Sequence, residues 1–325
     1  MPLTFVGDTD ATRSLTCAAR FSEDEGPEIG TAHVLAAMQL VVPRVKKLLD
    51  AFDITQPVLH TGYTKRAEPW APDDQVPDEV TVSGADTALV LSAGLTKALT
   101  RCMELPGTEP RSPEALLTAI LQDEDSRAAV VLRECGTDLD QLRQALSTGQ
   151  APQPADRVPA GLRTTRDTLL GRKVYRGRGL RGLLSSLLPI RLNWALAPVM
   201  WATLEADEIA KRRGGATRTD DILVAMLATY EVTLAYPHLS RSVPEQYDGV
   251  AALVAAGLDH RAAAEASAAL DPAGDAVPPK RLIQRGESYP RNTQELLDRL
   301  LAHEDNRSAR LLRAAGIRKT QASTS

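Results

Sequence analysis

Residues 109–138 read EPRSPEALLTAILQDEDSRAAVVLRECGTD, and residues 289–318 read YPRNTQELLDRLLAHEDNRSARLLRAAGIR. Aligned without a gap, the two segments are identical at 12 of 30 positions, including an E-D-x-R group and an L-R-x-x-G ending. A match of this extent between distant segments indicates an internal duplication. The repeated unit therefore decides the fold.

A shorter pattern of eight residues marks the start of a helix in four places. It begins with Thr or Pro beside polar residues and then turns apolar: TAHVLAAM at 31–38, PEALLTAI at 113–120, TDDILVAM at 219–226 and TQELLDRL at 293–300. Thr at an N-cap and Pro in the first helical turn are typical of helix starts. We therefore expect four copies of this helix.

A second helix is expected after each pattern, and it should end in a left-handed turn. In three repeats a glycine follows the last core leucine by four residues, at Gly136, Gly257 and Gly316, which is a C-cap signature. In the first repeat Asp53 takes that place, and Asp can adopt the left-handed region at some cost.

Three repeats also have a long helical run before the pattern, at 10–24, 85–105 and 192–213. The fourth repeat offers only the alanine-rich segment 260–270, because the prolines of 271–279 should end a helix there. We expect the fourth repeat to be remodelled.

Composition agrees with a helical fold. The chain has 325 residues, of which 43% are hydrophobic and 4% aromatic, with a formal net charge of −4. Scarce aromatic residues argue against an all-β fold, and the length predicts about two domains. We predict an all-α protein with helical domains at 1–149 and 190–325, joined by a basic linker at 150–189.

The cysteines and the N-terminus bear on location. Cys17, Cys102 and Cys135 form no CxxC pair, which favours a reducing compartment, and their helical surroundings predict core or near-core positions. No secretory signal is visible at the N-terminus. A cytoplasmic protein is therefore expected.

The basic linker has two interpretations. Residues 151–191 carry nine Arg or Lys against two Asp. This is either a solvated linker or an electrostatic arm for a partner, a membrane surface or nucleic acid. Aromatic residues for base stacking are nearly absent, so we expect no nucleic-acid partner. Pro189, Arg191 and Pro198 interrupt the apolar run that follows, so no membrane span is expected.

These repeats resemble a known family. Residues 28–38, EIGTAHVLAAM, are similar to the I-G-T-E-H-L-L-L-A-L motif of the N-terminal repeat domain of Clp AAA+ unfoldases. The resemblance covers about 9–148 and extends to 191–320 through the internal match. It implies a compact pseudo-twofold helical domain that binds substrates and adaptors without catalysis. The GxxxxGKS/T loop of the unfoldase motor is absent from the sequence.

The resemblance implies two candidate binding surfaces. In the family, the acidic residue of T-E-H helps line a pocket for arginine-phosphorylated clients. The matching positions here are Ala32, Glu114, Asp220 and Gln294, so Glu114 and Asp220 are candidates. The alternative is that these carboxylates only stabilise the first turn of a helix. His33, in the place of the motif His, is expected to be a structural hydrogen-bonding group.

The second implied surface lies where the first helices of the two repeats meet, and in the family it binds cyclic-peptide antibiotics. The corresponding segments are 3–10 and 80–86, which offer Phe5, Val6 and Val82. Ordinary hydrophobic packing of helix starts is the alternative interpretation.

Three functional hypotheses follow. The first is an adaptor or regulator that engages a Clp unfoldase, its adaptors or its clients. The second is a decoy that sequesters a cyclic peptide aimed at the unfoldase. The third, an enzyme on a helical scaffold, has no support from a GxSxG group, a metal-ligand spacing or a cofactor motif.

Overall fold

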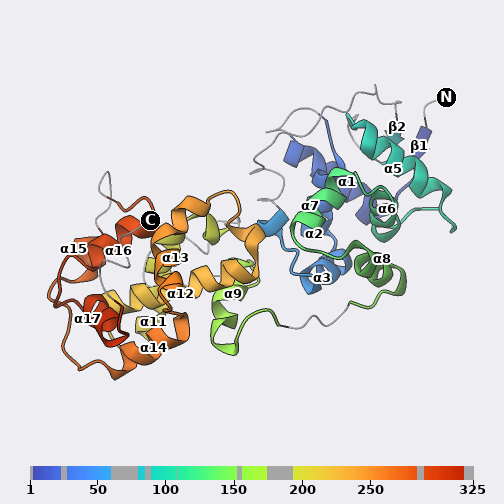
Figure 1. Ribbon diagram of the computed structural model, residues 1–325. Coiled ribbons are helices and arrows are strands. Elements are labelled where there is room, and N and C mark those ends of the chain that lie inside the picture. The colour runs from blue at the N-terminus through green and yellow to red at the C-terminus, as the bar shows by residue number, and fades with distance from the viewer. Residues whose placement is uncertain are drawn as a thin grey trace. The chain divides into compact units, whose positions relative to one another are not determined.

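The computed structural model describes residues 3–22, 28–59, 80–84, 89–107, 109–151, 156–173, 193–283 and 289–317 (Figure 1). The chain divides into two compact units, Met1–Ala155 and Asp156–Ser325. The described residues are predominantly helical, as the composition predicted, and the strands among them are three residues long. Within these ranges no helix combines the length and the apolar character needed to cross a membrane.

The described part of the first unit holds a pair of short strands and a series of helices. Its elements are β1 (Leu3–Phe5), α1 (Thr9–Ser22), α2 (Thr31–Val41), α3 (Pro43–Ala51), β2 (Val80–Val82), α5 (Ala93–Glu104), α6 (Pro113–Leu121), α7 (Arg127–Glu134) and α8 (Leu139–Thr148). In Figure 1, α2 lies among α1, α3 and α7, and it packs on each of them.

The regular elements in the described part of the second unit are helices. They are η1 (Ala160–Leu162), α9 (Arg163–Leu169), η2 (Trp194–Leu196), α11 (Pro198–Arg213), α12 (Thr219–Ala235), η3 (Pro237–Leu239), η4 (Pro244–Tyr247), α13 (Asp248–Ala255), α14 (His260–Ala269), α15 (Pro279–Leu282), α16 (Thr293–Leu300) and α17 (Arg307–Ala314). The long helix α12 packs on α11, α13, α14 and α17.

The four predicted helix starts are confirmed. Helices α2, α6, α12 and α16 begin at the first residue of each eight-residue pattern. The hydroxyl of Ser112 accepts a hydrogen bond from the N–H of Ala115, and Asn292 accepts one from Glu295. At α2 the N–H of Gly30 donates to Nδ1 of His33 at 3.0 Å, so His33 has the structural role expected of it.

The predicted left-handed turns are also confirmed in all four repeats. The φ angles are 63° at Asp53, 73° at Gly136, 93° at Gly257 and 75° at Gly316. In each case the next residue donates its N–H to the carbonyl of the last core leucine: Ile54 to Leu49, Thr137 to Leu132, Leu258 to Leu253, and Ile317 to Leu312. This closing bond satisfies a carbonyl that the end of the helix would otherwise leave unpaired.

One contact between repeats occurs in both units. The Thr31 hydroxyl accepts a hydrogen bond from the N–H of Ala128 at 3.1 Å, and Thr219 accepts one from Ser308 at 3.0 Å. Thr293 accepts the reciprocal bond from Val250 at 3.4 Å. The first residue of a pattern helix in one repeat thus meets the first turn of a helix in the other.

Glycine permits a close approach at the same junction. A Cβ atom at Gly249 of α13 would lie 2.5 Å from Cα of Gln294 in α16. Any larger residue would push these helices apart.

Two helices start later than their sequence pattern predicts. The run expected at 85–105 becomes helical only at Ala93, and residues 85–88 lie outside the described part. Before α5, the carbonyl of Val90 accepts from the N–H of Ile29, and Ser92 donates to the Ile29 carbonyl. This pairing holds the chain extended until Ser92 caps the helix. Similarly, the run expected at 192–213 forms α11 only from Pro198.

Part of the expected linker is folded. Residues 156–173, assigned to the basic linker from the sequence, belong to the second unit and form η1 and α9. Leu162 and Leu169 are buried there, and α9 packs on α12. Much of the positive charge in this segment is paired, because Asp156 contacts Arg163 and Arg166.

Candidate functional site

The structure brings Phe5 and Val82 together inside the first unit. Strands β1 and β2 pair in parallel with Phe5 opposite Val82, and these side chains are 0% and 6% exposed. Val6 is half-buried, and its carbonyl accepts a hydrogen bond from the N–H of Arg111 at 2.9 Å. Phe5 and Val82 are therefore packing residues that join the two repeats, and they offer a ligand no accessible surface.

The four positions matched to the family's acidic residue are very different from one another. Ala32 is buried in α2, and the Gln294 amide donates to Asp298 in α16. Glu114 lies half-buried in the first turn of α6, where its charge favours the helix N-terminus. Its carboxylate has no hydrogen bond or ion pair to the described residues. Only Asp220 is a fully buried acid.

Asp220 is held by an arginine of this chain. Its Oδ2 accepts from Nε of Arg307 at 2.9 Å and from the hydroxyl of Ser267 at 2.7 Å. The Arg307 side chain is 2% exposed, and its other nitrogens donate to the carbonyls of Asp271, Ala273 and Ser267. Asp220 therefore joins α12 to α17, which is a structural role that the sequence assignment to ligand binding did not anticipate.

A second ion pair stands beside the first. Arg213, at the end of α11, contacts both carboxylate oxygens of Asp221 in α12. Burial raises the pKa of the Asp221 carboxyl, although Arg213 lies against it. Asp275 accepts hydrogen bonds from Thr219 and from the N–H of Arg307, so it caps the first turns of α12 and α17.

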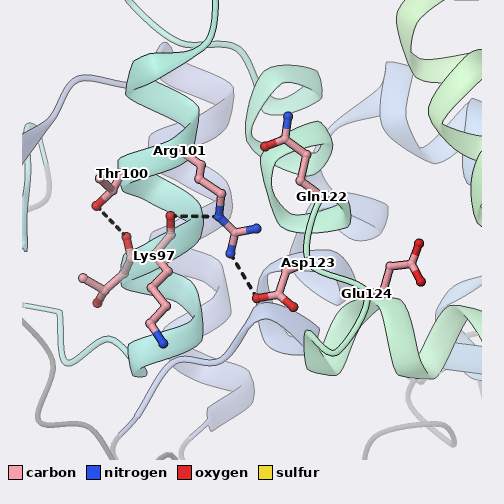
Figure 2. Close-up of a pocket in the computed structure, with 7 residues that line it drawn as sticks. Lys97, Thr100, Arg101, Gln122, Asp123 and Glu124 are labelled. Carbon is pink, nitrogen blue, oxygen red and sulfur yellow. Dashed lines mark hydrogen bonds and ion pairs between the residues drawn. The ribbon is translucent and has the colours of Figure 1, made fainter.

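The first unit has a polar groove of about 630 Å³. We call it the α5 groove. One side is formed by Thr96, Lys97, Thr100 and Arg101 of α5, and the other by Gln122, Asp123 and Glu124 between α6 and α7. Figure 2 shows Arg101 reaching across from α5 toward Asp123, with Gln122 and Glu124 beyond it.

Most charges of the α5 groove are already paired. Arg101 Nη2 lies 3.1 Å from Asp123 Oδ2, and Glu124 lies 3.4 Å from Arg143. Lys97 is exposed, and its ammonium group has no hydrogen bond or ion pair to a described residue. The Oγ1 of buried Thr96 also has no partner among these residues. The groove can therefore accept a polar chain and offers it an uncommitted positive charge.

Sequence reasoning missed this groove. Lys97 and Arg101 lie on α5, whereas Asp123 and Glu124 lie just before and at the start of the E-D-x-R group, about 20 positions further along the chain. The motif itself held the other missed residue, because Arg127 and Arg307 are its equivalent arginines. The first unit has Ala32 at the position where the second unit has Asp220. This difference in the sequence indicates that only the second unit can form the buried ion pair between an acid and the motif arginine.

Two buried groups of the second unit have shifted pKa values. Glu205 of α11 is 5% exposed and accepts from the Thr165 hydroxyl of α9 at 2.6 Å; burial raises the pKa of its carboxyl. Burial, with a contribution from Arg157, lowers the pKa of His238 to about 4. His238 packs edge-on against Tyr236.

The described residues give little support for a metal site or a reactive thiol. No group of three or more His, Cys, Asp or Glu side chains there is arranged to hold a metal ion. Cys102 and Cys135 are buried, as predicted, whereas Cys17 is half-buried. Burial raises the pKa of Cys102 to about 11, which keeps this thiol protonated at neutral pH.

Comparison with protein-family models, with curated proteins and with solved structures finds no match to this chain.

Proposed function

We propose that this protein is a non-catalytic binding protein of the Clp protease system. In this role it acts as an adaptor or regulator that engages the AAA+ unfoldase, its adaptors or its clients. The α5 groove receives a polar, acidic segment of that partner. The proposal rests on the sequence resemblance for the partner and on the groove for the place of contact.

The observation that carries the binding site is the ammonium group of Lys97, which is exposed and has no hydrogen bond or ion pair to a described residue. Arg101 and Glu124 each have an ion-pair partner, so a ligand would have to break a contact to use them. Lys97 can bind a ligand without breaking an existing ion pair. The Thr96 and Thr100 side chains lie on the same helix and also line the groove. A carboxylate or phosphate on an extended peptide would gain a charge-assisted hydrogen bond there.

The repeats supply a rigid frame for this groove. Helix α5 packs on α6, and Ser92 and Ser112 cap these two helices. Binding groups held on packed helices lose little conformational entropy when a ligand arrives.

The test measures the affinity of the full-length chain for the purified Clp unfoldase by biolayer interferometry. Lys97→Glu should weaken binding by about tenfold, because it places a like charge against an acidic segment. Lys47→Glu is the matched control, since Lys47 is also an exposed lysine of the first unit and does not line the groove.

Two outcomes would contradict the proposal. Equal losses for the two variants would mean that only net charge matters, and unchanged affinity for Lys97→Glu would remove the groove as the site. Absence of binding to the unfoldase and to Clp clients would remove the assignment to the Clp system. The decoy alternative places a cyclic peptide on a surface of Phe5, Val6 and Val82, and the burial of Phe5 and Val82 gives it less support than the groove gives the adaptor.

A further inference from the structure

The second unit has a partly open cavity of about 320 Å³ that the proposed function does not use. We call it the α12 cavity. It lies where the end of α11, the first turns of α12 and the end of α14 meet, and Arg307 of α17 lines it too. Its volume is at the lower end of the range for ligand pockets and suits a group of side-chain size.

Much of the lining is apolar. The apolar residues are Ile209, Val224, Ala264, Ala268 and Leu270, which come from α11, α12 and the α14 region. Val224 is 6% exposed, and Ile209, Ala264 and Leu270 pack against the core of the unit. An aliphatic group placed here would leave water for a mostly hydrocarbon surface.

The two acidic residues that line the cavity, Asp221 and Asp271, are both paired with arginines. Asp220 lies beside them outside the lining, and its buried Oδ1 has no hydrogen-bond partner among the described residues. Asp221 is held by Arg213, Asp220 by Arg307, and Asp271 by Arg310 at 2.7 Å. Asp275 does not line the cavity, and its oxygens accept hydrogen bonds from Thr219 and Arg307. A cationic ligand would therefore have to displace an arginine to pair with a lining carboxylate.

Arg218 is different from the other lining arginines. It is half-buried and directly precedes α12. Its backbone N–H donates to Asp221, but its guanidinium makes no hydrogen bond or ion pair with the described residues. Among the lining residues, the charged group that remains available is thus a guanidinium, whose planar fork matches a carboxylate.

We propose that the α12 cavity binds a carboxylate carried on a small aliphatic group. Arg218 receives the carboxylate, and the Ile209 and Val224 side chains receive the aliphatic group. Two sources present this chemistry: the last residue of a peptide with a free C-terminus, and a free acylated aliphatic amino acid. The cavity lies wholly in the second unit, so this inference does not rest on the α5 groove.

The experiment is isothermal titration calorimetry of the full-length chain with defined probes. These are the tripeptide acetyl-Ala-Ala-Leu, its C-terminal amide and acetyl-leucine. Both acids should bind if the small molecule suffices, whereas binding of the tripeptide acid alone would identify a peptide C-terminus. In either case the amide should bind about tenfold more weakly, because the charge-assisted bonds are lost.

Three variants separate recognition from folding. Arg218→Gln should weaken the acid probes about tenfold, and Ala264→Phe should block them by filling the cavity without changing charge. Arg281→Gln is the matched control, because Arg281 is exposed and lies outside the cavity. Circular dichroism should be unchanged in all three.

Several results would overturn the inference. They are no saturable binding of either acid by the unaltered protein, equal affinity for acid and amide, and full affinity in Arg218→Gln. Tighter binding of leucinamide, a cation, than of acetyl-leucine would also overturn it.

Discussion

Removing the charge of Asp220 should destabilise the second unit strongly. In Asp220→Asn the Arg307 guanidinium stays 2% exposed but loses the carboxylate that lies 2.9 Å from its Nε. Breaking a buried ion pair from one side costs about 3–5 kcal/mol of unfolding free energy, since the remaining charge is buried without a counter-charge. Solvent screening is small here because Asp220 itself is 0% exposed.

This loss should be visible as a lower Tm. For a unit of about 150–250 residues, each kcal/mol corresponds to about 2–4 °C, so we expect a drop of about 10 °C. Thermal unfolding can be followed by the fluorescence of Trp194 and Trp201, whose rings lie 5.9 Å apart in the second unit. The double variant Asp220→Asn with Arg307→Met should recover part of the loss, because no unpaired charge remains.

An exposed ion pair provides the control. Arg261 and Glu265 of α14 lie 2.9 Å apart but are 85% and 66% exposed, so Glu265→Gln should leave the Tm unchanged. A Tm for Asp220→Asn within about 2 °C of the unaltered protein would refute the reasoning, because by the size scaling it leaves less than about 1 kcal/mol for the pair.

Three further predictions concern the second unit. The pKa of His238 falls from 6.5 to about 4 on folding, so between these pH values only the unfolded chain takes up the proton, and the unfolding free energy decreases as the pH falls. His238→Gln should make the unfolding free energy, measured by urea titration, less dependent on pH in this range. An unchanged pH dependence would contradict the prediction. Gly316→Val should cost about 1 kcal/mol or more in the same titrations, since φ is 75° although no atom would meet the new Cβ. Burial raises the pKa of Glu205, so its charged form destabilises the fold as the pH rises. Glu205→Gln removes this charge and keeps an acceptor for the Thr165 hydroxyl, so it should increase the Tm above neutral pH. A lower Tm would show that the carboxylate is stabilising.

Local features were predicted well because their causes are local. The starts of α2, α6, α12 and α16 follow from the Thr or Pro in the first position of each helix, and at α6 and α16 also from a side-chain cap by the residue before it. The left-handed turn at Asp53 follows from its place four residues after Leu49. Backbone strain and capping depend on a few neighbouring residues, so a sequence displays them directly.

The surroundings of the candidate site residues could not be predicted from local patterns. Phe5 and Val82 are apolar residues that precede helices, and such residues occur both on binding surfaces and in hydrophobic cores. The pairing of β1 with β2 buries both side chains in the core. Asp220 matched the family's acidic position, yet Arg307, 87 residues further along the chain, made it structural. No local pattern contains either partner.

By itself, then, the sequence determined the repeated helices, their caps and the predominantly helical fold, since propensity, capping and apolar period act over a few residues. Which charged side chains have an ion-pair partner was settled by the tertiary fold. The fold pairs Asp220 with Arg307, whereas the charged groups of Lys97 and Arg218 have no partner among the described residues. Whether a charged side chain is a structural group or a binding group depends on what the fold places within about 4 Å of it, and that distance is set by packing between segments remote in the chain.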